Sequence, residues 1–392
     1  MTKRMRQGAV AAAALLLGTA AACGGQDTSG RPSHHGSAGA GGPAAQRGFT
    51  LVASGDVLPH DSVISQANED ADGEGHDFGP MLADVKPVVS GADVAICHME
   101  TVYAADGEPY TGYPAFTSPP EIAQGLRATG YDACSTASNH ALDDGADGVR
   151  RTLDAFDKAG VKHAGSARSA AEAARPALLT AGGAKIAQLA YTYGTNGFPM
   201  PDGQPWAVGL INERKIVADA RAARRAGADV VVVSLHWGTE WETDPDEDQI
   251  GLGKKLTASR TGGRPDIDLI LGTHAHVPQP YEKVNGTWII YGMGDQIAGT
   301  MFNDSGAFDP RGNYGSIGRF TFAPPAAKGQ RWQVRKAEFI PQMMDLDAGR
   351  VVNLPRAVRE SPDRDDYREV QSEISEAVLD RGAAADGLTM GR

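Results

Sequence analysis

Side chains of the kinds that bind metal ions or move protons follow several short apolar runs of this 392-residue chain. Two histidines, His274 and His276, come directly after the apolar run 267–271 and just before Pro278 and Pro280. Similar candidates follow other apolar runs: Asp56, His98, Glu100, Asn139, His140, His236 and Glu240. Mixed shells of imidazole and carboxylate suit divalent transition metals. Together these residues predict a metal-type site.

Each of these residues also has an ordinary explanation when it is taken singly. A lone histidine after a strand, such as His236, is usually a surface or satisfied polar residue. Asp56, which follows Gly55, could cap the next helix instead. The prediction of a metal site therefore depends on the number of candidates and requires that they meet in one place.

A two-metal site places specific demands on its ligands. Two cations about 3.5–4 Å apart repel each other, so a carboxylate must bridge or flank them, and open positions must remain for water and substrate. His274 and His276 would point to the same side of an extended segment, because side chains alternate with a period of two. The prolines that follow would stiffen this segment and lower the entropy cost of holding both rings.

The elements that must position these residues read as an α/β fold. Apolar runs at 49–54, 93–97, 131–136, 185–191, 229–235, 268–272, 287–292, 318–323 and 332–340 predict strands, and 147–160 and 212–227 predict amphipathic helices. The late strands follow one another without helices, which predicts antiparallel pairing at one side. In open α/β sheets the carboxyl ends of the strands line the ligand crevice, so the candidates should share one edge.

The N-terminal region predicts export from the cytoplasm. Residues 1–22 have a basic start, an apolar stretch and small residues before Cys23, as in a lipoprotein signal peptide. Ala20 stands where the lipoprotein signal usually has Leu, so ordinary secretion remains an alternative. Residues 23–47 read as a flexible Gly/Ser/Ala/Pro tether. We expect an extracytoplasmic protein, anchored to the cell membrane through a lipidated Cys23.

Composition excludes some partners and leaves one covalent feature open. Apolar residues make up 41% of the chain, which is enough for a sizeable core. The formal net charge is −12 without a compensating basic cluster, so nucleic acid is not expected as a partner. Cys97 and Cys134 could form a disulfide outside the cytoplasm or remain free thiols in buried strands.

Six motifs in a fixed order resemble those of the CapA family of bacterial poly-gamma-glutamate capsule synthesis proteins: "GDVLPH", "HMETV", "NHALDDG", "LHWGTEW", "THAHVPQP" and "IIYGMGDQ". The resemblance spans about residues 49–323 and implies the calcineurin-like metallophosphoesterase fold, a four-layer αββα sandwich. We therefore expect a CapA-like metallophosphatase domain at 48–343. A polar C-terminal extension with one helix should follow at 344–392.

The resemblance also implies roles for individual residues. It makes metal ligands of Asp56, Glu100, Asn139, His236, His274 and His276, which would hold two divalent ions of Mn, Fe or Zn. It implies that His140 protonates a leaving group or steadies developing charge, and that Asp143 or Glu240 orients it.

Three departures from the family pattern qualify this expectation. Metallophosphoesterases carry Asp-x-His at the first motif, but Leu58 stands here and His60 comes two residues late, which puts one metal position in doubt. His98 replaces the usual Asn, as a compensating ligand or as a cover for the site. Asp295 and Gln296 replace the usual Asn-Phe, adding an acceptor that we place at the rim of the site.

Three functions are compatible with these residues. The first is a metal-dependent hydrolase or transferase at the outer membrane face, in the synthesis, release or trimming of poly-gamma-glutamate or a related wall polymer. The second is a non-catalytic accessory lipoprotein that binds the anionic polymer or its synthase complex. The third is a general phosphomonoesterase or nucleotidase, which the fold permits but does not prove.

Overall fold

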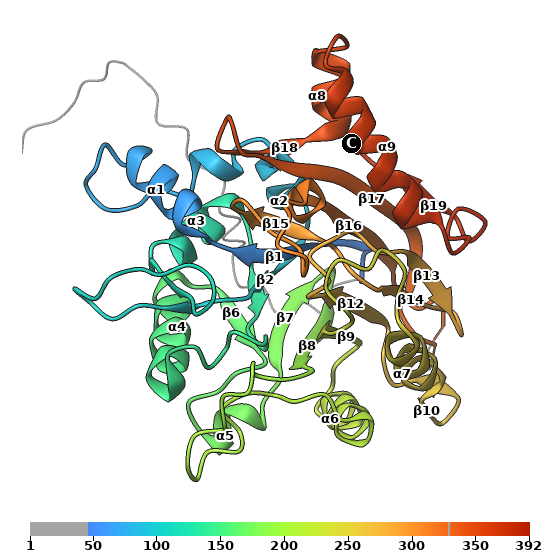
Figure 1. Cartoon of the computed structure of the whole chain (residues 1–392). Coiled ribbons are helices and arrows are strands. Elements are labelled where there is room, and N and C mark those ends of the chain that lie inside the picture. The colour runs from blue at the N-terminus through green and yellow to red at the C-terminus, as the bar shows by residue number, and fades with distance from the viewer. Residues whose placement is uncertain (1–45, 328–329) are drawn as a thin grey trace, which may run out of the picture. The chain divides into compact units, whose positions relative to one another are not determined.

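Two β-sheets form the centre of the molecule, packed face to face (Figure 1). The computed structural model describes residues 46–327 and 330–392; the expected signal peptide, Cys23 and the tether up to residue 45 lie outside the described residues. The first sheet runs in the order β18 (Arg350–Asn353), β17 (Gln333–Asp345), β16 (Tyr314–Ala323), β1 (Phe49–Leu58), β2 (Val94–Met99), β5 (Ala133–Ser135) and β6 (Lys162–Ala164), with β15 (Asp295–Ala298) on β1 and β19 (Leu388–Met390) on β17.

The second sheet is smaller and carries the other half of the strand ends. Its order is β13 (Tyr281–Val284), β14 (Thr287–Ile290), β12 (Leu269–Thr273), β9 (Val230–His236), β8 (Ala184–Thr192) and β7 (Ala177–Ala181). Two short ribbons, β3 (Val102–Tyr103) with β4 (Thr117–Ser118) and β10 (Arg260–Thr261) with β11 (Arg264–Pro265), lie outside the sheets. Strands β1, β2, β5 and β6 run parallel, as do β8, β9, β12 and β14.

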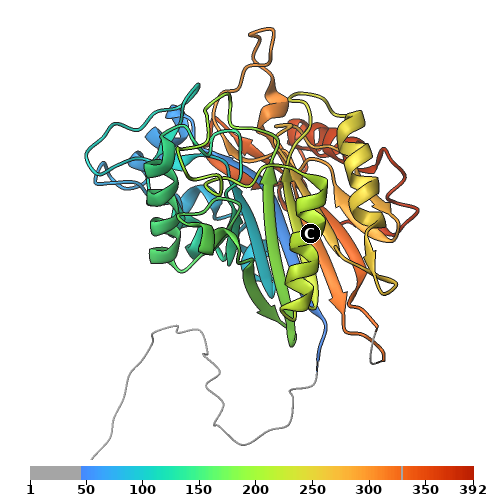
Figure 2. The same ribbon diagram turned by 90° about the horizontal axis from the view of Figure 1, so that it is seen from below.

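Helices cover the outer faces of both sheets (Figure 2). Those over the first sheet are α1 (Asp61–Glu69), α2 (Lys86–Ser90), α3 (Ile122–Thr129) and α4 (Gly145–Ala159); those over the second are α6 (Glu213–Arg225) and α7 (Glu247–Ala258). The short α5 (Ala170–Ala173) and the 3-10 turns Pro80–Leu82 and Pro310–Asn313 lie in connections. The predicted four-layer αββα sandwich is confirmed.

The apolar strands are continuous runs because both of their faces are buried. In β9, Val230 and Val232 pack between the sheets, whereas Val231 and Val233 pack against α6 and α7. The helices begin at local caps: the Asn212 side chain accepts from the backbone N–H of Lys215 at the start of α6. Both helices predicted from the sequence are present.

The C-terminal segment differs from the expected polar extension with one helix. Residues 344–392 contain two helices, α8 (Leu354–Glu360) and α9 (Asp365–Leu379), and the strands β18 and β19, both paired with β17. Tyr367, Val370, Ile374 and Val378 of α9 are buried in the main core. The prediction was wrong because the charged residues of α9 occupy only its outer face and conceal a four-residue apolar stripe.

Antiparallel pairing of the late strands is confirmed for β16 with β17 and for β17 with β18. Strand β14, by contrast, pairs in parallel with β12.

The structure also answers whether the two cysteines of the parallel strands are bonded. Cys97 on β2 and Cys134 on β5 are register partners, and they form a disulfide.

Candidate metal centre

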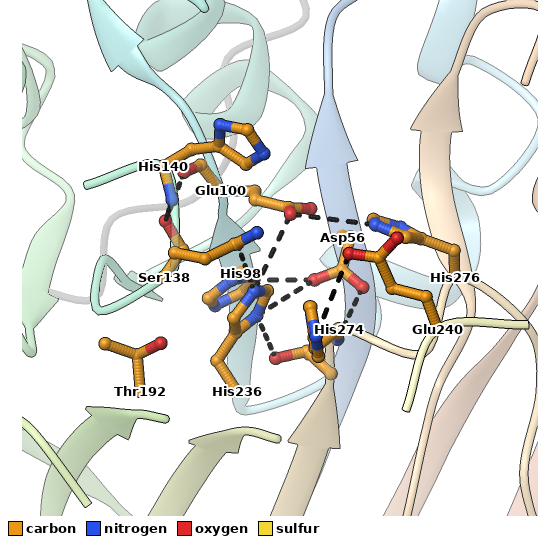
Figure 3. A network of polar contacts seen from close by, with 12 residues as sticks. Asp56, His98, Glu100, Ser138, His140, Thr192, His236, Glu240, His274 and His276 are labelled. Atoms are coloured by element: carbon orange, nitrogen blue, oxygen red, sulfur yellow. Dashed lines mark hydrogen bonds and ion pairs between the residues drawn. The ribbon is translucent and has the colours of Figure 1, made fainter. Parts of the chain in front are cut away.

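The six predicted metal ligands lie together at the carboxyl ends of strands from both sheets, and Figure 3 labels all of them except Asn139. Asp56 belongs to β1 and His236 ends β9, while Glu100 follows β2 and Asn139 follows β5. His236 Nε2 lies 2.8 Å from Asn139 Oδ1 and 3.6 Å from Glu100 Oε1, and its Nδ1 lies 3.8 Å from Asp56 Oδ1. All six side chains are buried. Residues as far apart in sequence as Asp56 and His276 therefore lie in one buried cluster.

The donors fall into overlapping groups whose ligand atoms lie within 4.8 Å of one another. These groups are Asp56, His98 and His236; Glu100, His236 and His274; Glu240, His274 and His276; and Asp56, His276 and Asp295. Asp56, His236, His274 and His276 each occur in two groups, so the four groups form one connected cluster of donors.

The two histidines after β12 converge by a different route from the one expected. His274 and His276 have φ values of 95° and 58°, so the segment is a left-handed bend and not extended chain. Such values are uncommon for residues with a side chain and strain the backbone. The bend turns both rings inward, with ring centroids 6.0 Å apart, and the backbone N–H of His274 donates to Asp56 Oδ2 at 3.0 Å. The expectation of period-two alternation was therefore wrong.

Hydroxyl groups in the strands orient two of the imidazole rings. Ser135 Oγ lies 2.7 Å from His98 Nδ1, and Thr273 Oγ1 lies 3.0 Å from His236 Nδ1. When the outer nitrogen of a ring is engaged in this way, the other nitrogen is directed at the site. The Nε2 atoms of both rings thus face the carboxylates of Asp56 and Glu100.

Three buried carboxylates of the cluster have no Lys or Arg partner among the described residues. Burial and the neighbouring Asp295 raise the pKa of Asp56 to about 8, and burial raises the pKa of Glu100 well above its usual range. Burial raises the pKa of Asp295 to about 6. The ion pairs of these three groups in the described residues are with histidines alone.

The histidines divide into two electrostatic types. Burial lowers the pKa of His236 and His274 well below the usual value and that of His98 to about 3, so these rings are neutral. Burial also opposes the charge on His276, but Asp295 and Glu100 outweigh it and raise the pKa of His276 well above its usual range. Neutral imidazoles are the form that binds metal.

Unpaired polar atoms give the clearest indication of what the pocket holds. Asp56 Oδ1, His98 Nε2, both carboxylate oxygens of Glu100, His274 Nδ1 and Asp295 Oδ2 are buried without a hydrogen-bond partner. Leaving such atoms unpaired costs free energy, and buried charges in proteins are paired or bind metals. The donor set therefore fits divalent cations.

His140 and Asp143 form a separate pair beside this donor cluster. His140 Nδ1 lies 2.6 Å from Asp143 Oδ2, and this oxygen also accepts from the backbone N–H of Phe116 at 2.7 Å. The backbone N–H of His140 donates to Ser138 Oγ at 3.1 Å, and Ser138 in turn donates to the backbone oxygen of Glu100. Asp143 thus fixes the ring through Nδ1, and Nε2, which lies 3.5 Å from Asn196 Nδ2, is the nitrogen left to handle a proton.

Glu240 lies on the other side of the pocket. Its Oε1 is 3.9 Å from His274 Nε2, and its side chain is 38% exposed. Figure 3 shows it beside His276 and away from His140. Of the two carboxylates expected to orient His140, Asp143 makes the contact and Glu240 does not.

A family model described as bacterial capsule synthesis protein PGA_cap matches residues 50–300. This match covers most of the chain and all of the donor cluster. The chain belongs to this capsule synthesis family.

Curated relatives agree with the family. The chain is 29% identical over 204 residues to the "PGA biosynthesis protein CapA" of Bacillus subtilis, covering 51% of this chain and 52% of the relative. It is 29% identical over 223 residues to a "Probable polyglutamine synthesis accessory protein" of Mycobacterium tuberculosis, covering 53% of this chain and 56% of the relative. The chain thus spans about half the length of the curated relatives it matches.

Solved structures with a similar arrangement include the "calcineurin-like phosphoesterase YfkN from Bacillus subtilis". It is 13% identical, with a TM-score of 0.43, over 83% of this chain and 99% of that one. These values do not transfer an activity, so the chemistry of this PGA_cap member has to be judged from its own residues.

The departures from the family motifs have clear outcomes in the structure. His60 does not replace the histidine missing at Leu58, because it belongs to none of the donor groups found in the described residues. Its Nδ1 lies 3.0 Å from the backbone oxygen of Leu58 and 3.1 Å from the backbone N of Gly299. His98 does face the site, with Nε2 3.5 Å from Asp56 Oδ1.

Asp295 is the residue that the sequence placed wrongly. It is fully buried in β15 and not at the rim, and its Oδ1 lies 3.0 Å from His276 Nδ1. The signal for it was present, since an acidic residue follows the strand-like run 287–292 just as Asp56 and Glu100 follow theirs.

Proposed function

We propose that this protein is a metal-dependent hydrolase or transferase that acts on an anionic capsule or wall polymer of the poly-gamma-glutamate type. The observation that carries the proposal is the cluster of buried, unpaired donors beside the fixed His140–Asp143 pair. Family membership supports the polymer class, because the family model is described by capsule synthesis and a relative is named for PGA biosynthesis.

The residues of the chain divide the chemical work between them. Asp56, Glu100, Asn139, His236, His274 and His276 would hold the cations. A bound divalent cation supplies an acidified water and polarises a phosphoryl or carbonyl oxygen. His140 would hold a proton at Nε2 for the leaving group, and Asp143 would stabilise the positive charge on the ring when it is protonated.

The charge of the protein bears on how a polyanion could bind. With a net charge of −12, the molecule repels an anionic polymer at long range. Cations held in the crevice would invert the local field at the point where the chain must be bound. The proposal therefore requires metal for binding as well as for the reaction.

We place the protein outside the cytoplasm, anchored through a lipidated Cys23, with the polymer or its synthase complex as partner. The support is the signal-like segment 1–22 and the name of the accessory-protein relative. In the described part of the chain, no helix combines the length and apolar character needed to span a bilayer.

A second candidate is a non-catalytic accessory protein that binds the polymer or the synthase. One observation favours it: position 58 lacks an imidazole, and His60 belongs to none of the donor groups of the described residues. Under this alternative the donor cluster would bind cations only to recruit the polyanion.

One set of assays separates the two candidates. The metal content of the purified full chain is measured first. The protein is then incubated with γ-linked polyglutamate, with and without an added amine acceptor, and the length of the polymer is followed. The hydrolysis of a generic phosphate ester is measured in parallel. Under the enzyme proposal, His140→Ala keeps its metal but loses activity by roughly 100-fold or more.

The matched control is His163→Ala. His163 lies on β6, outside the cluster, and its Nε2 is 3.3 Å from Asp157 Oδ1. It should leave the activity unchanged. A wild-type protein that binds metal and polymer but breaks or transfers no bond would replace the enzyme proposal with the accessory role.

A further inference from the structure

Asp295 lies directly beside Asp56 because two glycines allow their strands to approach closely. Asp56 and Asp295 are register partners on the parallel strands β1 and β15, and the backbone N–H of Asp56 donates to the backbone oxygen of Gly294 at 3.0 Å. A Cβ atom on Gly55 would lie 1.7 Å from that oxygen, so only glycine fits there. The fold thus brings two carboxylates together in the interior.

The atoms of Asp295 are arranged for more than orientation of His276. Its Oδ1 lies 3.0 Å from His276 Nδ1, a separation that suits either a hydrogen bond or two donors on one ion. Its Oδ2 is buried with no partner, and so is Asp56 Oδ1. If Asp295 only oriented the ring, one oxygen would suffice, and the other would stay desolvated at a cost of about 1–3 kcal/mol.

The local charge leads to the same conclusion. Asp56, Asp295 and Glu100 are each at most 1% exposed, and in the described residues no Lys or Arg pairs with any of them. His276 is the one nearby group that could offset their charge. A bound divalent cation would offset these charges and satisfy the unpaired oxygens.

We propose that Asp295 is a direct ligand of a divalent cation, which it holds together with Asp56 and His276. These three residues offer one ligand atom each within 4.8 Å of one another. Asp295 therefore adds a seventh ligand to the six expected from the motifs. The inference rests on the metal binding contained in the proposed function, but it does not depend on the reaction that follows.

The test compares Asp295→Asn and Asp295→Ala in the full chain. The metal-free protein is titrated with Mn²⁺ by calorimetry, bound metal is counted by elemental analysis, and the visible spectrum of the Co²⁺ form reports on its coordination. Asn retains an oxygen that can accept from His276 but loses the charge. For a direct ligand, Asp295→Ala should lose more than the roughly 10–100-fold in affinity typical of an orienting partner and should alter the Co²⁺ spectrum, and Asp295→Asn, whose neutral amide oxygen is a weaker donor, should lie between Ala and the wild type.

The matched control is Asp268→Asn. Asp268 is also a buried aspartate with an unpaired Oδ1, but it precedes β12 at the end remote from the cluster and pairs with Arg224. It should bind Mn²⁺ as the wild type does. To exclude misfolding, thermal unfolding is measured without metal, where Asp295→Asn should be at least as stable as the wild type because one of the crowded charges is gone.

Wild-type stoichiometry and affinity in Asp295→Asn would overturn the inference and assign Asp295 an orienting role through its hydrogen bond. That result is independent of activity. A wild-type protein that binds Mn²⁺ through Asp295 yet acts on no polymer or ester would remove the enzyme proposal and leave this inference standing.

Discussion

Buried carboxylates in two regions of the fold differ in whether a Lys or Arg side chain pairs with them. Before β12, Asp268 accepts from the backbone N–H of Val231 at 2.8 Å and pairs with Arg224, and on β17 Glu338 pairs with Arg319 and Lys336 at 2.9 Å each. At the carboxyl ends of the strands, Asp56 and Glu100 have no such cation. The protein supplies its own positive charge in the first places and leaves the second to be neutralised from outside.

This difference shows how a binding site can be recognised among buried carboxylates. Both kinds of carboxylate are desolvated, so burial alone does not distinguish them. Unpaired oxygens facing neutral imidazoles distinguish the site. A structural ion pair such as Asp268–Arg224 offsets the charge from within the protein even though Asp268 Oδ1 is unpaired, whereas the site leaves both charge and unpaired oxygens for a ligand.

Metal removal should produce the largest contrast between the two regions. Chelation of the purified protein should lower the free energy of unfolding by about 4 kcal/mol per site when the free metal had stood at about 1,000 times its dissociation constant. Calorimetric melting with and without a chelator measures this loss, and re-addition of Mn²⁺ should reverse it. Unchanged melting would show that the carboxylates are satisfied without metal.

The next largest loss of stability should follow from removal of the arginine that pairs with a buried carboxylate. Arg224→Met leaves Asp268 buried without its main partner, and we expect a loss of about 3 kcal/mol in unfolding free energy. Denaturant titration measures the loss, while metal stoichiometry should remain that of the wild type. A fall in bound metal in this variant would contradict the separation of the two regions.

The smallest expected effect is on the free energy of unfolding, which two matched substitutions should change in opposite directions. In metal-free protein, Glu100→Gln should stabilise the fold by about 1 kcal/mol, because it removes a carboxyl group whose pKa burial holds well above its usual range. Glu338→Gln should instead destabilise it by about 1 kcal/mol, since two cationic partners lose the negative charge of their acceptor. Chemical denaturation of both variants measures the difference, and effects of the same sign would show that the regions do not differ as described.

Much of the fold and most of the candidate site could be predicted from the sequence, because both depend on local patterns. The β9 segment is a run of four valines, and its ending in His236 was readable without knowing its neighbours. Asp295 follows the apolar run 287–292, but it was misplaced because it starts the four-residue strand β15 directly after Gly294, and its burial depends on the pairing of β15 with β1. The packing of α9 was missed because its apolar residues are spaced among charges.

The amino-acid sequence by itself determined which strands are buried, which residue types stand at their ends, and membership of the capsule synthesis family. The tertiary structure decided the rest: that His274 and His276 converge through a left-handed bend, that Asp143 and not Glu240 holds His140, and that Asp295 lies beside Asp56. The physical reason is that strand and helix patterns arise from neighbours along the chain. The direction of a side chain into a shared pocket depends on close approaches, such as that of Gly55 to Gly294, between segments far apart in sequence.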